Sequence, residues 1–304
     1  MLPLIPRLVL CILFSPLLFG IIGKTKAFFA GRNGPPVLQL YYDMVKLFQK
    51  SSVTSLTTTW IFRAAPLISM SAVLAASFLI PFGGLKAPIQ FLGDVLLFAA
   101  LFGLARFFMV LAALDTGSSF EGMGASREAA FSCLSEIALF LNFAALAVLS
   151  KSFSLSLLIG GRSWSSWVTM GPSLVLVTLS YFMILLVENS RIPIDDSATH
   201  LELTMIHEVM VLDHSGPDFA FIVYAGAIKL FVLGGFLVTI LLPFQSQNGM
   251  VNGIVFLSGM AGLALAIGVV ESAMARLRLD RVSAFITGSF VLASFGLIIA
   301  LSRV

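Results

Sequence analysis

Long apolar runs alternate with short polar segments along the whole chain. Runs long enough to cross a bilayer lie at 4–22, 64–80, 90–113, 131–149, 168–187, 219–243, 252–271 and 283–301. The pattern predicts an all-α polytopic membrane protein, in one integral membrane domain over 1–304, with about eight transmembrane helices. No small-residue cleavage site separates the first run from Lys24 and Lys26, so we interpret that run as a retained helix rather than a signal peptide.

The composition excludes an ordinary soluble domain. The chain is 59% hydrophobic and 11% charged, with a mean hydropathy of +1.03, whereas soluble domains carry roughly 25% charged residues. The net charge of +3 does not indicate a nucleic-acid-binding protein, because the cations flank the apolar runs.

Lysine and arginine are distributed unequally between the two sets of connections. Eleven lie in the segments 23–63, 114–130, 188–218 and 272–282, and five lie on the opposite side. Because cytoplasmic loops carry an excess of Lys and Arg, these four segments are predicted to be cytoplasmic and both termini to lie outside.

Two of these cytoplasmic segments are predicted to contain helices of their own. Residues 37–50 place apolar side chains at helical spacing opposite polar ones, which is typical of an interfacial or partner-facing amphipathic helix. A tight turn is expected before it, over 31–36. Asp196 is predicted to cap a helix that runs to about Leu212.

The polar residues of segment 188–218 form the strongest chemical signal. Its residues 188–214 contain six of the chain's 15 carboxylates and all three histidines: Glu188, Asp195, Asp196, Glu202, Glu208, Asp213, His200, His207 and His214. Glu188 ends an apolar run, where a charge is costly unless it is paired, hydrated or protonated, and Arg191 one turn later is its expected partner. Carboxylates and imidazoles in partly dry sites can pass protons. The alternative is a hydrated loop that docks a partner through ordinary salt bridges.

A second polar group lies around segment 114–130, and two cations lie inside apolar runs. The group comprises Asp115, Glu121, Arg127, Glu128 and Glu136, with Glu136 expected just inside the fourth helix. Arg106 and Lys229 lie within the third and sixth runs; each either exchanges protons or forms a structural ion pair with one of these carboxylates.

We expect neither a zinc site nor an iron–sulfur cluster in this chain. His200 and His207 are seven residues apart and lack the closer spacing and third ligand of a zinc site. Cys11 and Cys133 cannot hold an iron–sulfur cluster and are interpreted as small apolar packing residues.

Three stretches together resemble the complex I subunit 1 family. They are residues 34–39 (GPPVLQ) with Asp43 and Lys46, residues 117–120 (GSSF) with 122–128 (GMGASRE), and residues 188–208 (ENSRIPIDDSATHLELTMIHE). The match is greatest to the branch found in energy-converting [NiFe]-hydrogenases of the hydrogenase-4 and formate hydrogenlyase type.

The resemblance implies a subunit without a catalytic centre of its own, in a bacterial or archaeal cytoplasmic membrane. It implies partners: hydrogenase large and small subunits, an iron–sulfur subunit and antiporter-like membrane subunits. The iron–sulfur clusters and the [NiFe] centre are expected in those partners, and no cofactor in this chain. Candidate proton-coupling residues are Glu188, Arg191, Asp195, Asp196, His200, Glu202, His207 and Glu208, then Glu121, Arg127, Glu128, Glu136 and Lys229. Arg32, Gln39, Asp43 and Lys46 are expected to contact the peripheral arm.

Three other functions fit parts of the pattern. The quinone-reducing branch of the same family lines a quinone chamber with these loops, but there Phe usually follows the proline, where this chain has Ile194. The chain departs from the hydrogenase branch at one position, where it has Glu121 and a small residue is expected. A secondary transporter is disfavoured because no inverted repeat is visible. A passive anchor that only docks partners remains a third alternative.

Overall fold

The computed structural model describes the backbone of residues 4–83, 85–160, 164–195, 205–244 and 246–303. Its helices are α1 (Leu4–Phe29), α2 (Gln39–Phe48), α3 (Trp60–Ser77), α4 (Asp94–Asp115), α5 (Ser119–Ser150), α6 (Leu155–Gly160), α7 (Trp164–Glu188), the 3-10 turn η1 (Glu208–Val211), α8 (Gly216–Leu241), α9 (Gly249–Ala273) and α10 (Leu279–Arg303). Within these ranges, eight helices are long and apolar enough to cross a membrane, which confirms the predicted count. The chain is a multi-pass, all-helical membrane protein; the direction of insertion stays a prediction.

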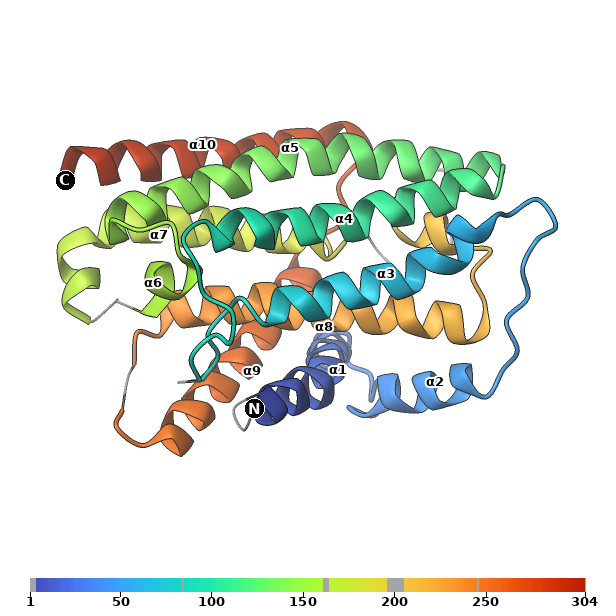
Figure 1. Cartoon of the computed structure of the whole chain (residues 1–304), viewed down its shortest axis with the longest axis horizontal. Helices are drawn as coiled ribbons and strands as arrows, with labels where there is room; N and C mark the ends of the chain where they lie inside the picture. The colour runs from blue at the N-terminus through green and yellow to red at the C-terminus, as the bar shows by residue number, and fades with distance from the viewer. Residues whose placement is uncertain (1–3, 84, 161–163, 196–204, 245, 304) are drawn as a thin grey trace.

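Helix α8 lies near the middle of the bundle (Figure 1), where it packs against α1, α3, α7 and α9, whereas α10 packs on α5 and α7. Helices α4, α5, α7 and α10 lie to one side, and α1, α2 and α9 to the other. Phe236 of α8 packs against the rings of Phe98, Phe143 and Tyr181, with centroid separations of 6.5, 5.5 and 5.0 Å. Such aromatic contacts fix neighbouring helices against one another, so charged side chains that α4, α5, α7 and α8 carry are held in a defined geometry.

The amphipathic segment forms α2, as its spacing predicts. Met44 is buried while Lys46 is exposed, and the ring of Phe48 packs against Phe221 of α8 at 5.4 Å. The turn before α2 uses left-handed backbone at Gly31 and Gly34, with φ of 64° and 57°.

The predicted loop over 114–130 is mostly helix, because α5 begins at Ser119. Glu136 therefore lies well inside a long helix rather than near its start. Gly122 and Gly124 are both helical, and the second is needed for packing: a Cβ on Gly124 would lie 2.4 Å from Cγ1 of Val209. Close approach to a neighbouring segment, rather than left-handed backbone, therefore explains the glycine at position 124.

The helix predicted to run to Leu212 is wrong for its described part. Residues 205–212 contain only the short turn η1, and the predicted start at Asp196 lies outside the described residues. Val209, Met210 and Val211 are consecutive and all buried, which is incompatible with one apolar helix face. Pro172 lies inside α7, which is kinked at Met170 (φ −117°, ψ 16°).

Candidate proton-coupling site

Glu188, the last residue of α7, is the centre of a buried ionic cluster. Its side chain is 5% exposed. Arg106 of α4 donates from Nη2 to both carboxylate oxygens at 2.7 and 2.6 Å, and Lys229 Nζ of α8 lies 2.9 Å from Oε2. The Ser135 hydroxyl of α5 donates to Oε1 at 2.8 Å. Three other helices thus supply the partners of one carboxylate, which is the condition for keeping a charge away from water.

Arg106 also pairs with two further carboxylates. Its Nε lies 3.6 Å from Glu128 Oε1, and its Nη1 donates to Glu136. The Glu136 side chain is 41% exposed, whereas that of Arg106 is 10% exposed. The sequence left open whether Arg106 and Lys229 form ion pairs or exchange protons; both are ion-paired, and Arg106 is the residue that joins three predicted carboxylates.

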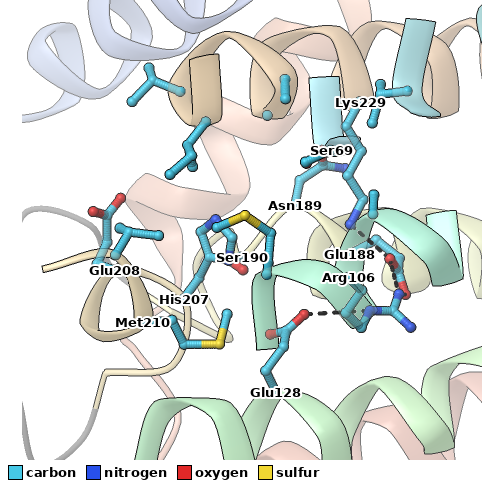
Figure 2. A pocket seen from close by; sticks show the side chains of 18 of the residues that line it. Ser69, Arg106, Glu128, Glu188, Asn189, Ser190, His207, Glu208, Met210 and Lys229 are labelled. Carbon is cyan, nitrogen blue, oxygen red and sulfur yellow. Dashed lines mark hydrogen bonds and ion pairs between the residues drawn. The ribbon is translucent and has the colours of Figure 1, made fainter. Parts of the chain in front are cut away.

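A cavity of about 180 Å³ adjoins this cluster. Figure 2 shows Lys229, Glu188 and Arg106 on one side of it and His207 and Glu208 on the other. Its apolar wall includes Phe19, Val73, Phe102, Met109, Phe219 and Ile222. The volume has room for on the order of ten waters, and the charged wall offers them the several polar partners that buried water requires.

Arg191 does not pair with Glu188, so that expectation is wrong. After Glu188 the chain makes a left-handed turn, with φ of +48° at Ser190. The amide of Ser190 donates to Val187 O and that of Arg191 to Leu186 O, at 3.1 and 2.9 Å. This is a Schellman ending, which reverses the chain and cancels the one-turn spacing on which the expectation rested. Arg191 still lines the cavity. Burial lowers the pKa of Arg191, and the charge of Glu271, near the end of α9, opposes that effect.

Asp195 connects the end of α7 to two other segments. Its Oδ2 accepts the amides of Ile206 and His207 at 3.0 Å each, and its Oδ1 lies 2.9 Å from Arg276 Nη2. Asp195 is 1% exposed. It therefore fixes His207 at the cavity wall. Asp196, His200 and Glu202 lie outside the described residues.

Glu121 and Arg127 are not part of the cavity wall. Glu121 is fully buried and its Oε1 accepts the Asp213 amide at 2.9 Å; Arg127 Nη1 donates to Met205 O at 2.8 Å. Both residues attach α5 to the segment before α8. Their arrangement supports an anchoring contact at this position rather than membership of the Glu188 cluster.

His214 is buried but lies apart from the other polar groups of its segment. Its ring stacks on Phe62 with centroids 3.9 Å apart, and neither ring nitrogen has a hydrogen-bond partner within the described ranges. Burial lowers the pKa of His214 to about 4, although the charge of Asp218 acts in the opposite direction. His214 is thus a neutral stacking residue, and it does not line the cavity as His207 does.

The residues expected to contact a peripheral arm lie on or just before α2. Gln39 Nε2 donates to Asp43 Oδ1 at 2.8 Å, while Arg32 and Lys46 are exposed. Their contact with a partner stays a prediction. Among the described residues, no group of three or more His, Cys, Asp or Glu side chains is placed to hold a metal ion.

Sequence reasoning missed Glu271, near the end of α9. Its side chain is 2% exposed; Oε2 lies 3.0 Å from Lys26 Nζ and Oε1 lies 3.5 Å from Arg191 Nη1. The signal was present, because Glu271 ends the apolar run 252–271 in the same way that Glu188 follows the run 168–187. Glu188 lies within one of the three stretches that resemble the family, whereas Glu271 lies in none of them.

Comparison with known proteins identifies the family. The sequence profile described as "NADH dehydrogenase" matches residues 4–302. The chain belongs to that family, the complex I subunit 1 family. Formate hydrogenlyase subunit 4 of Escherichia coli (strain K12) is 32% identical over 300 residues, which cover 97% of this chain and 94% of that protein. Hydrogenase-4 component C of the same organism is 30% identical over 238 residues, covering 78% and 73%.

The quinone-linked relatives are more distant. A subunit of the NADH-quinone oxidoreductase of Syntrophotalea carbinolica is 28% identical over 280 residues, covering 86% of this chain and 80% of that protein. A chain of the membrane-bound sulfane sulfur reductase, an archaeal respiratory membrane complex, has the same fold, with a TM-score of 0.84 at 22% identity over 99% of this chain and 100% of that one. The resemblance found in the sequence, including its hydrogenase branch, is confirmed.

Proposed function

We propose that this chain is the membrane anchor and proton-coupling subunit of a formate hydrogenlyase or hydrogenase-4 type [NiFe]-hydrogenase complex. The chain links a cytoplasmic electron-transfer arm to ion-translocating, antiporter-like membrane subunits, in a bacterial or archaeal cytoplasmic membrane. The iron–sulfur clusters and the [NiFe] centre reside in the hydrogenase and iron–sulfur partners. The two Escherichia coli relatives, matched over most of their lengths, support this assignment.

The Glu188 cluster is the observation on which the proposal depends. Glu188 is buried beside a cavity large enough for water and held by two cations, one of which also holds Glu128 and Glu136. A charge that moves or a proton that arrives near one member changes the preferred ionisation of all the others, because Coulomb energies are large where water is scarce. Such a cluster can convert a redox event in a neighbouring subunit into proton movement.

The test replaces Glu188 by glutamine in the assembled complex, reconstituted in sealed vesicles. Glu188→Gln is expected to leave assembly intact and to lower the number of protons moved per hydrogen formed by about tenfold. Asp280→Asn removes a carboxylate of α10 that is 62% exposed and serves as the matched control. Unchanged proton movement in Glu188→Gln would leave only the passive-anchor function.

One observation favours a second candidate, the quinone-chamber subunit of a proton-pumping NADH:quinone oxidoreductase. The cavity has an apolar wall facing its charged groups, as small-molecule sites do. In that case quinone would copurify with the complex, and quinone-site inhibitors would block turnover. Absence of both results, with hydrogen evolution present, selects the hydrogenase function.

A further inference from the structure

Glu271 forms a second ionic centre, which is connected to the cavity through Arg191. It contacts Lys26 of α1 at 3.0 Å and Arg191 at 3.5 Å, and its side chain is 2% exposed. Glu188 has the same set of partners, one arginine and one lysine. A buried carboxylate with two cationic partners is costly to assemble unless its charge is used or its geometry is required.

Arg191 belongs to both this centre and the cavity. It lines the cavity, and its guanidinium carbon lies 3.9 Å from the ring centroid of Phe19. Glu208, on the cavity side, also attracts it. Arg191 Nη2 and Glu271 Oε1 make no hydrogen bond within the described ranges. The contact is therefore looser than the two hydrogen bonds between Arg106 and Glu188, and Arg191 is the cation that can leave its partner at lower cost.

We propose that Glu271 is a further proton-binding residue of the coupling machinery, and that Arg191 carries its charge state to the cavity. The proposal rests on the proposed function. When Glu271 is ionised, it holds Arg191 on the α9 side. When one oxygen takes a proton from a hydronium ion, an O–H bond of that ion breaks, an O–H bond forms on the carboxyl group and a water molecule is left. The negative charge of Glu271 then disappears, and Arg191 turns toward Glu208 and Glu188. When that proton returns to water, Glu271 recovers its charge and draws Arg191 back.

The charged groups around Glu271 support proton exchange with water at the α1 end and a response of Arg191 at the cavity end. Lys26 reaches it from α1, Arg191 from the segment after α7, and Glu208 acts through Arg191 from η1. Arg276, in the loop after α9, is paired with Asp195. The Lys26 side chain is 37% exposed, so the aqueous end of this centre lies along α1. The cavity end is Arg191, and two discrete positions of that side chain make the centre a two-state element.

The experiment compares Glu271→Gln with Glu188→Gln in the whole complex, in the same vesicles. Glu271→Gln is expected to lower the protons moved per hydrogen formed by about fivefold or more, with assembly and hydrogen evolution from an artificial electron donor retained. Infrared difference spectra recorded between two pH values are expected to lose one carboxyl C=O band. Asp280→Asn should leave both measurements unchanged.

Each outcome has a distinct meaning. Loss of coupling in Glu188→Gln with none in Glu271→Gln would overturn this inference and leave the proposed function standing. Coupling retained in both would overturn the proposed function itself. If Glu271→Gln fails to assemble, the double variant Glu271→Gln with Arg191→Gln also removes the buried cation, and only Lys26, whose side chain is 37% exposed, loses its partner. A double variant that assembles and remains coupled would reduce Glu271 to a structural role.

Discussion

Glu188 and Glu271 are paired in the same way but differ in how far their partners lie from water. The cations on Glu188 have side chains that are 10% and 19% exposed, for Arg106 and Lys229. Those on Glu271 are 13% and 37% exposed, for Arg191 and Lys26. The first centre is interior and shares its arginine with two more carboxylates. The second has one partner at the surface and one at the cavity.

Because of this difference, Glu188 is expected to keep its partners, whereas Glu271 is expected to exchange a proton and change partner. A carboxylate enclosed by three helices and two hydrogen bonds from one guanidinium resists rearrangement, because every alternative leaves a buried charge unpaired. A carboxylate held at 3.5 Å by an arginine that faces a cavity can change partner with a smaller penalty. The comparison predicts graded effects when the cations are removed one at a time.

Removing Arg106 is expected to have the largest effect. Arg106→Met leaves Glu128 and Glu136 without their shared partner, and Glu188 with Lys229 as its one remaining cation beside the Ser135 hydroxyl. Breaking a buried ion pair costs about 3–5 kcal/mol, so the free energy of unfolding in detergent should fall by that amount and assembly should suffer. Phe107→Leu, at the next and 57% exposed position of α4, is the control. A loss below about 1 kcal/mol would show that the cluster is hydrated and the contrast between the centres is unfounded.

The sequence predicts the fold better than it predicts these contacts. Apolar run length alone locates all eight spans, because a span is apolar whether it faces lipid or, like α8, mostly other helices. The motif containing Glu188 locates the site. The sequence singles out Arg106 and Lys229 as candidate partners but leaves open which carboxylate each contacts, because their helices are distant in the chain and only packing brings them together. Glu271 of α9 is missed altogether. The pairing of Glu188 with Arg191 fails for a local reason: no sequence rule marks Ser190, a non-glycine residue, as the left-handed end of α7.

Removing Arg191 is expected to have a smaller effect than removing Arg106. Arg191→Met leaves Glu271 buried but still paired with Lys26, and it loses the contact with the Phe19 ring. We expect the free energy of unfolding to fall by about 2–3 kcal/mol, measured by denaturation in detergent. Arg191→Lys should recover only part of this, since lysine lacks the planar guanidinium. An effect equal to that of Arg106→Met would make the two centres equivalent.

His214 also tests the cost of a buried charge that has no partner. Its ring nitrogens have no hydrogen-bond partner among the described residues. Burial holds its folded-state pKa at about 4, below its usual 6.5. Between these values the unfolded chain binds more protons, so stability is fully present above pH 6.5 and is lost as the pH falls toward 4. The loss is at most about 3 kcal/mol. His214→Phe keeps a ring on Phe62 and should remove this component of the pH dependence. A pH profile identical to that of the unsubstituted protein would mean that His214 is hydrated.

Removing Lys26 is expected to have the smallest effect on stability. Its side chain is 37% exposed, and Glu271 retains Arg191 when it is lost. Half-exposed pairs contribute little because water and salt screen them, so Lys26→Met should cost less than about 1 kcal/mol. Lys24→Met removes the same charge two residues earlier, where Lys24 contacts only the Asn33 carbonyl, at 2.8 Å, among the described residues. If Glu271 exchanges protons through the α1 end, Lys26→Met should change the pH profile of coupling while Lys24→Met does not, even though the two variants unfold alike. Identical pH profiles in the two variants would move the aqueous end of the Glu271 centre away from α1.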